Sequence, residues 1–118
     1  YYKKMNNSLG IIERQTFWSN LENKVVERTY LLNIHYLGEK NNIQFYKITS
    51  NDESFKSGEM MINQNINEII YSKNIRYNDN LVQSVLHKVN TPQNLWTGYS
   101  IKTKSPENNY ISLEFITK

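Results

Sequence analysis

The chain has two histidines, His35 and His87, and these are the first side chains that could act as acid–base catalysts or metal ligands. They lie in separate segments, and neither belongs to a His-Glu-x-x-His pattern, which would bring two imidazoles and a carboxylate together on one helix. A catalytic base at His35 would need a neighbouring nucleophile, yet no serine stands in a Gly-x-Ser-x-Gly context. We therefore interpret both histidines as ordinary surface residues.

Carboxylates gather around one loop, where Asp52, Glu53 and Glu59 could supply oxygen ligands to Ca²⁺. The loop lacks the alternating ligands and the central glycine of an EF-hand. The chain has no cysteine, which excludes thiolate metal sites, disulfides and cysteine nucleophiles, and its four glycines form no phosphate-binding loop. The sequence therefore predicts a protein that is not an enzyme and that needs no metal or cofactor.

Tyrosines stand close to lysines in several places, among them Tyr71 with Lys73 and Tyr99 with Lys102. On an open sheet face, such pairs could stack on the bases and neutralise the phosphates of a single strand. Tyrosines with the ring in the core and the hydroxyl in water explain the pattern equally well. The net charge of +3 is spread along the chain, which is typical of a solvated surface, so nucleic-acid binding stays an alternative.

Two phenylalanines are the remaining candidates for an exposed contact. Phe17 lies beside the apolar stripe of a predicted helix, and Phe55 is the single large apolar side chain in a polar loop over residues 50–58. The candidate interaction residues are therefore Phe17, Phe55, Tyr71, Lys73 and Lys102.

Two segments have the spacing of helices. In residues 3–27, Ile11, Trp18 and Val25 fall close to one stripe at helical spacing. Asn78-Asp79-Asn80 then offers a helix N-cap, and the stripe that begins at Leu81 and Val82 predicts a short helix that ends before Pro92.

Three segments alternate with period two and predict β-hairpins. The first joins residues 30–36 to 43–49 through a turn over 38–42, and the second joins 59–63 to 67–73. The third closes the chain: a turn over 105–109 follows the strand that begins at Leu95, and Ile111, Leu113 and Phe115 share the buried face of the last strand. The predicted fold is a single α+β domain over residues 1–118, with the N-terminal helix packed on an antiparallel sheet and a second short helix before the C-terminal hairpin.

This order of elements resembles the soluble domains of minor pilins and pseudopilins. The resemblance is carried by the helical segment Ile12-Glu-Arg-Gln-Thr-Phe-Trp-Ser-Asn-Leu21 and by Asn80-Leu-Val-Gln-Ser-Val85, which leads into Trp96 and the closing hairpin. It implies a subunit of a type IV pilus, type II secretion or competence machine, with an apolar helix upstream of Tyr1. The layout also resembles cystatin-like and nuclear-transport-factor-like folds.

Since the chain starts at Tyr1 and its first methionine is Met5, we expect that an upstream signal or membrane anchor has been removed. The expected function is that of a non-enzymatic bacterial interaction module, a subunit or adapter of a surface, pilus-like or secretion/DNA-uptake assembly. Its partners would be proteins, its contact with a membrane would be limited to the missing anchor, and its location would be extracytoplasmic, at the cell surface or anchored, with the cytoplasm left open. The alternatives are a small basic nucleic-acid-binding domain and a secreted inhibitor or immunity protein that uses the loop over 50–58.

Overall fold

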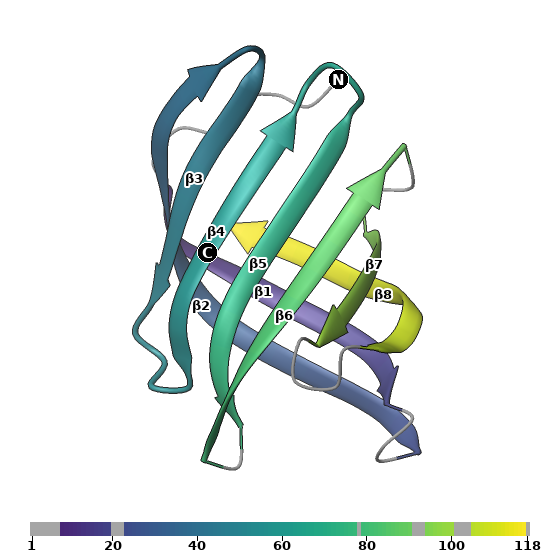
Figure 1. Ribbon diagram of the computed structural model, residues 1–118. Coiled ribbons are helices and arrows are strands. Elements are labelled where there is room, and N and C mark those ends of the chain that lie inside the picture. The colour runs from purple at the N-terminus through teal and green to yellow at the C-terminus, as the bar shows by residue number, and fades with distance from the viewer. Residues whose placement is uncertain (1–7, 20–22, 78, 91–93, 101–104, 118) are drawn as a thin grey trace.

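The computed structural model describes residues 8–19, 23–77, 79–90, 94–100 and 105–117, and in these ranges the chain forms a closed barrel of antiparallel strands with no helix (Figure 1). The strands are β1 (Ser8–Ser19), β2 (Lys24–Lys40), β3 (Ile43–Ser50), β4 (Phe55–Asn63), β5 (Glu68–Tyr77), β6 (Asn80–Val89), β7 (Leu95–Ser100) and β8 (Ser105–Thr117).

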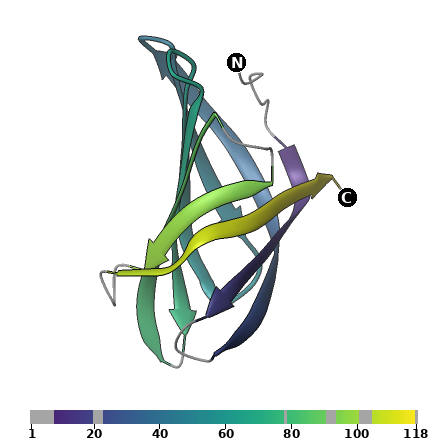
Figure 2. The same cartoon turned by 90° about the vertical axis from the view of Figure 1, so that its right-hand side faces the viewer.

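Each strand pairs with the next one along the chain, and β8 returns to pair with β1, so the order is up-and-down. The closing pair joins Ile11–Thr16 of β1 to 112–117 of β8, and Figure 2 shows the two strands running side by side. We call the end with the β2–β3 and β4–β5 turns the upper end, as it lies in Figure 1, and the end with the β3–β4 and β5–β6 turns the lower end.

Alternate side chains of every strand point into the barrel. Leu32, Ile34, Ile48, Tyr71 and Leu86 have none of their surface exposed and form the centre of the core. An eight-stranded barrel has an interior that side chains can fill, or that can hold one small ligand. Closure also leaves no free sheet edge, so the two-layer arrangement predicted from the sequence is replaced by one sheet curled on itself.

The predicted N-terminal helix over residues 3–27 is wrong wherever the structure describes it, because this segment forms β1 and the start of β2. Ile11, Glu13 and Gln15 point inward, while Ile12 and Arg14 lie on the outer side. Because apolar residues lie on both faces of this strand, their spacing resembles that of a helical stripe. Because two of the inward residues are polar, the strand does not show the apolar–polar alternation from which a β-strand is predicted.

The predicted short helix before Pro92 is also wrong, because residues 80–89 form β6. Val82 and Leu86 face inward and Val85 lies on the outer side, so the apolar residues at helical spacing belong to two faces of a strand. Asp79 has a φ of 63° and lies in the turn between β5 and β6, where it is not a helix cap. The fold is therefore all-β and not α+β, and the resemblance to minor pilins, which depended on the N-terminal helix, is not supported.

The first two predicted hairpins are confirmed as β2–β3 and β4–β5. The first turn is shorter than predicted, because Gly38 belongs to β2 and only Asn41 and Asn42 form the connection, with φ values of 54° and 64°. Positive φ at both central residues is the geometry that Asn tolerates in tight hairpin turns. In the closing hairpin, Leu113 is buried as predicted, but residues 105–109 belong to β8 and do not form the turn.

Candidate functional site

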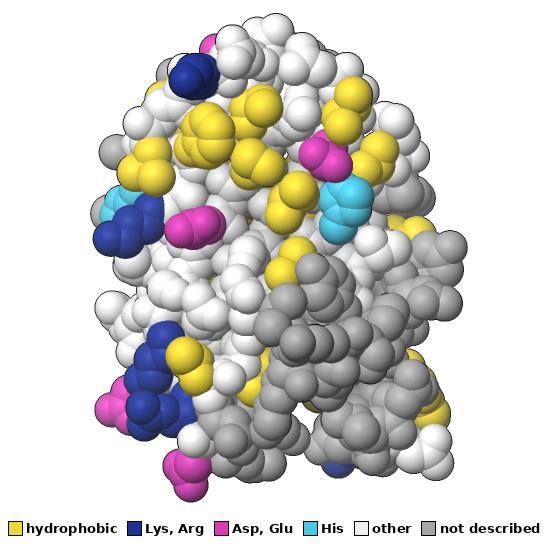
Figure 3. Space-filling view, in the orientation of Figure 1, with side chains coloured by type: hydrophobic (Ala, Val, Ile, Leu, Met, Phe, Trp, Pro, Cys, Tyr) yellow, Lys and Arg dark blue, Asp and Glu magenta, His cyan; other side chains and the backbone are white. Residues whose placement is uncertain are grey.

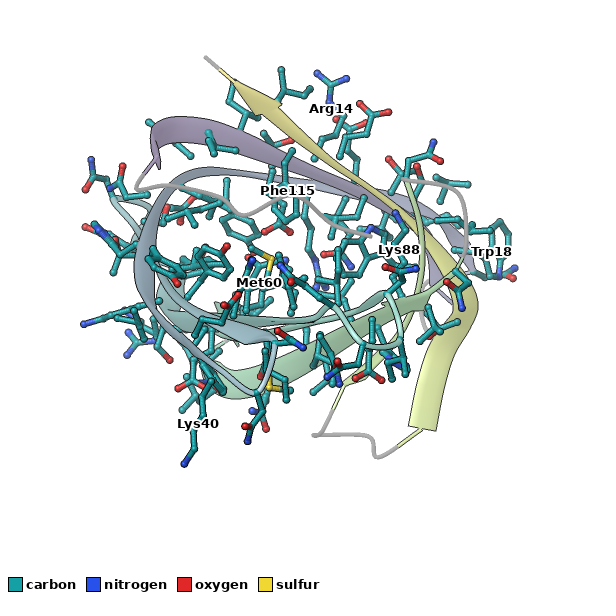
Figure 4. All side chains as sticks on the ribbon, turned by 90° about the horizontal axis from the view of Figure 1, so that it is seen from above. Arg14, Trp18, Lys40, Met60, Lys88 and Phe115 are labelled. Atoms are coloured by element: carbon teal, nitrogen blue, oxygen red, sulfur yellow. The ribbon has the colours of Figure 1, made fainter. Side chains whose placement is uncertain are left out.

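A cavity of about 580 Å³, which we call the upper cavity, occupies the upper end of the barrel. Its wall is formed mainly by large apolar side chains from β4, β5, β7 and β8: Met60, Ile62, Ile69, Trp96, Leu113 and Phe115. Lys88, Asn94 and Glu114 are its polar lining residues, and Asn94 and Glu114 are exposed at the rim. Seen from above, Met60, Lys88 and Phe115 point into the ring of strands (Figure 4).

The alternation of the strands explains why this wall is apolar. On β4, Met60 and Ile62 face inward, whereas Glu59 and Met61 between them lie on the outer side. The same rule places Lys88 inside, because it follows the inward residue Leu86 by two positions. A lysine thus occupies a core-facing position at the upper end of β6.

Lys88 and Trp96 supply hydrogen-bond donors to the cavity wall. Lys88 is 4% exposed, and its ammonium nitrogen lies 5.9 Å from the centre of the Trp96 ring. Burial lowers the pKa of Lys88, because the charged form loses hydration. Trp96 is 3% exposed, and its indole Nε1 is buried with no hydrogen-bond partner among the described residues. A buried donor without a partner is rare in folded proteins and requires an explanation.

Phe115 connects the upper cavity to a second cluster deeper in the barrel. Its ring centre lies 6.4 Å from that of Trp96, edge to face, and 5.8 Å from that of Tyr71. Pairs at these distances are ordinary aromatic packing contacts. Phe115 thus contacts an aromatic ring of the cavity wall and one of the buried cluster below.

That buried cluster is polar. The Lys73 ammonium donates hydrogen bonds to the Glu13 carboxylate and, at 2.9 Å, to Gln15 Oε1, while the Tyr71 hydroxyl donates to Glu13 Oε1 at 2.5 Å. Burial lowers the pKa of Lys73, against the opposing attraction of Glu13, and burial raises the pKa of Tyr71 well above its ordinary value. Glu13, Tyr71 and Lys73 have no exposed surface, so we interpret the cluster as structural.

The residues of the predicted interaction surface whose side chains the structure describes lie inside the barrel. Tyr71 and Lys73 are adjacent but lie inside the barrel, so neither is placed to stack on a nucleic-acid base. Phe55 is also inside and packs edge to face on Tyr30 at 5.5 Å. Phe17 belongs to β1, but its side chain lies outside the described part of the structure, as do Lys102 and the side chain of Tyr99.

The two histidines and the carboxylate Asp52, which the sequence analysis considered as site residues, make local contacts. His87 Nε2 lies 2.8 Å from Glu68 Oε2 on the outside of the barrel, and His35 Nε2 lies 3.4 Å from Thr49 Oγ1. Asp52 accepts bonds from the backbone and hydroxyl of Ser54 at 2.8 and 2.6 Å, and these bonds lower its pKa. Asp52 therefore orders the β3–β4 turn.

The described residues contain no group of three His, Asp or Glu side chains arranged to hold a metal ion. Within the same ranges, no helix has the length and apolar character required to cross a membrane.

A further hollow lies on the outer face of the sheet, and another lies at the lower end of the barrel, where the core residues Tyr30 and Ile75 contribute to its lining. Leu37, Phe45, Met61 and Ile70 contribute to a groove of about 550 Å³ over the middle strands, where apolar side chains gather in Figure 3; we call it the outer groove. At the lower end, a hollow of about 470 Å³ is lined by Lys24, Arg28 and Arg76 together with Glu27.

The sequence predicts Leu113 and Phe115 as buried-face residues of the last strand but does not predict the upper cavity that they line. Trp96 is named only in the resemblance to minor pilins, and Lys88 lies in the segment predicted to be a short helix. The signal that could have found Lys88 is the alternation of Val82, Ser84, Leu86 and Lys88, which places a cation in line with buried residues.

Comparisons with family models, with curated proteins and with solved structures give no match, so a function for this chain is argued from the geometry of its barrel.

Proposed function

We propose that this protein binds a small, largely apolar molecule in the upper cavity and acts as a binding protein. The observation that carries the proposal is a cavity of about 580 Å³ inside the barrel, walled by Met60, Ile62, Ile69, Trp96, Leu113 and Phe115. Small-molecule sites are concave, mostly apolar and supplied with a few polar groups, and their volumes are roughly 300–1,000 Å³.

The apolar lining of the space and its opening support a ligand site. Asn94 and Glu114 are exposed at the rim of the upper cavity, so a small molecule has access to the apolar wall. A ligand that fills it would gain about 25 cal/mol for each Å² of apolar surface removed from water.

The position of the polar groups favours binding without catalysis. Tyr71 and Lys73, in which burial favours the neutral form, have no exposed surface and lie in the Glu13 cluster, where no substrate reaches them. His35 and His87 lie on the outside, apart from the cavity. The absence of enzymatic activity stays a prediction, and the geometry of these residues supports it.

The predictions of extracytoplasmic location and of protein partners in a surface or secretion assembly stay predictions as well. A partner would be sought first at the outer groove, because Leu37 and Phe45 there are 65% and 38% exposed. Contiguous exposed apolar surface often marks a protein contact.

Titration with the neutral fluorescent probe N-phenyl-1-naphthylamine tests the proposed function. The fluorescence of the probe is measured with excitation at a wavelength that tryptophan does not absorb. We expect saturable binding of one probe per chain to the wild-type protein. Ile69→Trp, which fills the upper cavity, should abolish binding. Ile70→Trp is the matched control, because Ile70 is the next residue but lines the outer groove.

Thermal melts of both variants must show folded protein for this comparison to count. Loss of probe binding in Ile70→Trp but not in Ile69→Trp would place the apolar site in the outer groove and contradict the proposal. Absence of probe binding to the wild-type protein would contradict it outright.

A further inference from the structure

The outer groove lies where the barrel reverses the usual polarity of a solvated sheet. On β3, the polar residue Gln44 points inward and is 1% exposed, whereas its neighbour Phe45 points outward and is 38% exposed. The water-facing side of an antiparallel sheet is ordinarily polar. A buried glutamine beside an exposed phenylalanine therefore favours a contact surface at this place on the outer face.

Phe45 belongs to a row of apolar side chains that crosses four strands. The pairing of β3 with β4 places Phe45 opposite Met61, and the pairing of β4 with β5 places Met61 opposite Ile70. Leu37 extends the row onto β2, at the register shift beside Phe45, and it is 65% exposed. Side chains directly opposite each other on paired strands are in reach of one another, so the row is contiguous, and Figure 3 shows apolar side chains gathered on this face.

Two opposite charges lie in the next row of the same face. Lys47 follows Phe45 by two positions on β3, Glu59 precedes Met61 by two positions on β4, and the pairing places Lys47 opposite Glu59. Both side chains are exposed and line the outer groove. Among the described residues, neither side chain has an ion-pair partner.

The apolar row is symmetric about a line that runs between β3 and β4. If two copies pack face to face about a two-fold axis along this line, Phe45 of each copy lies against Met61 of the other. The same axis places Leu37 on β2 against Ile70 on β5 of the other copy. Face-to-face packing with nearly aligned strands is one of the two common arrangements of sheets.

The charged row obeys the same symmetry. The axis places Lys47 of each copy against Glu59 of the other, so two intermolecular ion pairs form. A two-fold interface uses the same surface on both copies and therefore requires a surface that is complementary to itself. The outer groove meets this requirement in its apolar residues and in its charges.

We propose that the outer groove is the interface of a reversible homodimer, in which two copies of this chain pack face to face about a two-fold axis between β3 and β4. This inference does not depend on a ligand in the upper cavity. The barrel is closed, so association through a free strand edge is not available and must use the side chains of a face. A row of four apolar residues is small for an obligate interface, which predicts a dimer that dissociates on dilution.

Other occupants fit this face less well. A membrane surface would cover the apolar row but would supply no fixed partner for both Lys47 and Glu59, and anionic lipid would be repelled by Glu59. A small apolar molecule would leave the charged row without a role. A second copy supplies a carboxylate for the lysine and a lysine for the carboxylate.

Sedimentation velocity of the full chain at a series of concentrations and about 0.15 M salt, which screens attraction between net charges, tests the proposal. We expect a reversible monomer–dimer equilibrium. Lys47→Glu should weaken the dimer about tenfold or more, because like charges would face each other at both contacts, and Glu59→Lys should do the same. Arg14→Glu is the control, because it makes the same change of charge at an exposed position of β1 outside the groove.

An equimolar mixture of Lys47→Glu and Glu59→Lys tests the two-fold arrangement itself. In the mixed dimer opposite charges face each other at both contacts, so the mixture should dimerise within a few-fold of the wild type although each variant alone does not. Phe45→Ser examines the apolar row and should also weaken the dimer. Thermal melts check that each variant is folded, as expected for substitutions of exposed side chains.

Four results would overturn the proposal. The first is a wild-type chain that stays monomeric up to about 1 mM. The second is a dimer that neither Lys47→Glu nor Phe45→Ser weakens, because it would use another face. The third is a mixture that dimerises no better than the separate variants, and the fourth is an equal loss in Arg14→Glu, which would assign the effect to overall charge.

Discussion

Lys73 and Glu13 form an ion pair inside the barrel, with neither side chain exposed to water, although they are 60 residues apart in the chain. The pair joins β1 to β5 across the interior, and Tyr71 and Gln15 complete its hydrogen bonds. A second lysine, Lys88, is nearly as buried but lies in the wall of the upper cavity. The pair between Lys73 and Glu13 is therefore expected to contribute to the stability of the fold.

Lys73→Met should destabilise the fold by about 3–5 kcal/mol, because it leaves the Glu13 carboxylate buried without its partner. Urea denaturation measures the change, with Lys56→Met as the exposed control. A loss smaller than about 1 kcal/mol would mean that the interior accommodates the lone carboxylate and that the ion pair does not hold β1 to β5.

Lys88→Met tests the environment of Lys88, because it removes the titrating ammonium and keeps a side chain of similar length. The pKa of Lys88 is lowered in the folded state, so the unfolded chain binds more protons at alkaline pH. The wild type should therefore gain stability relative to Lys88→Met as pH rises from neutral toward the ordinary lysine value of about 10.4. Urea denaturation of both proteins across that range measures the difference; a constant difference, or a loss of stability of the wild type relative to Lys88→Met, would contradict the assigned environment.

Leu113→Ala should cost about 2–5 kcal/mol, because Leu113 is 1% exposed and packs in the core at the wall of the cavity. Glu114→Ala is the adjacent control on an exposed side chain and should change stability by no more than about 0.5 kcal/mol. Equal effects of the two substitutions in urea melts would show that the inward face of β8 is assigned wrongly.

The sequence predicted the β2–β3 and β4–β5 hairpins because their inward residues, such as Leu32, Ile34 and Ile62, alternate with polar ones. It failed at β1 and β6, where Glu13 and Lys88 occupy inward positions and apolar residues occupy outward ones. Patterning assigns charged residues to water, and an interior ion pair breaks that rule.

The closed barrel itself also lay beyond the sequence argument. Lys73 is buried because β1 returns Glu13 to face it, and that contact depends on β8 pairing with β1. The alternation of residues within one strand does not indicate which other strand it pairs with, so the pairing of β1 with β8 could not be predicted. The upper cavity could not be predicted for a similar reason, because its wall combines residues from five strands that span about half of the sequence, from Met60 to Phe115.

The most direct test of the central claim is a ¹H–¹⁵N spectrum of the two tryptophan indoles during titration with N-phenyl-1-naphthylamine. Trp96 is buried in the wall of the upper cavity, whereas Trp18 is 43% exposed on the outside, so each protein molecule carries its own control. We predict that the Trp96 indole resonance shifts and saturates at one equivalent while the Trp18 resonance stays in place. A titration in which the Trp96 resonance does not move, or moves no more than that of Trp18, would contradict ligand binding in the upper cavity.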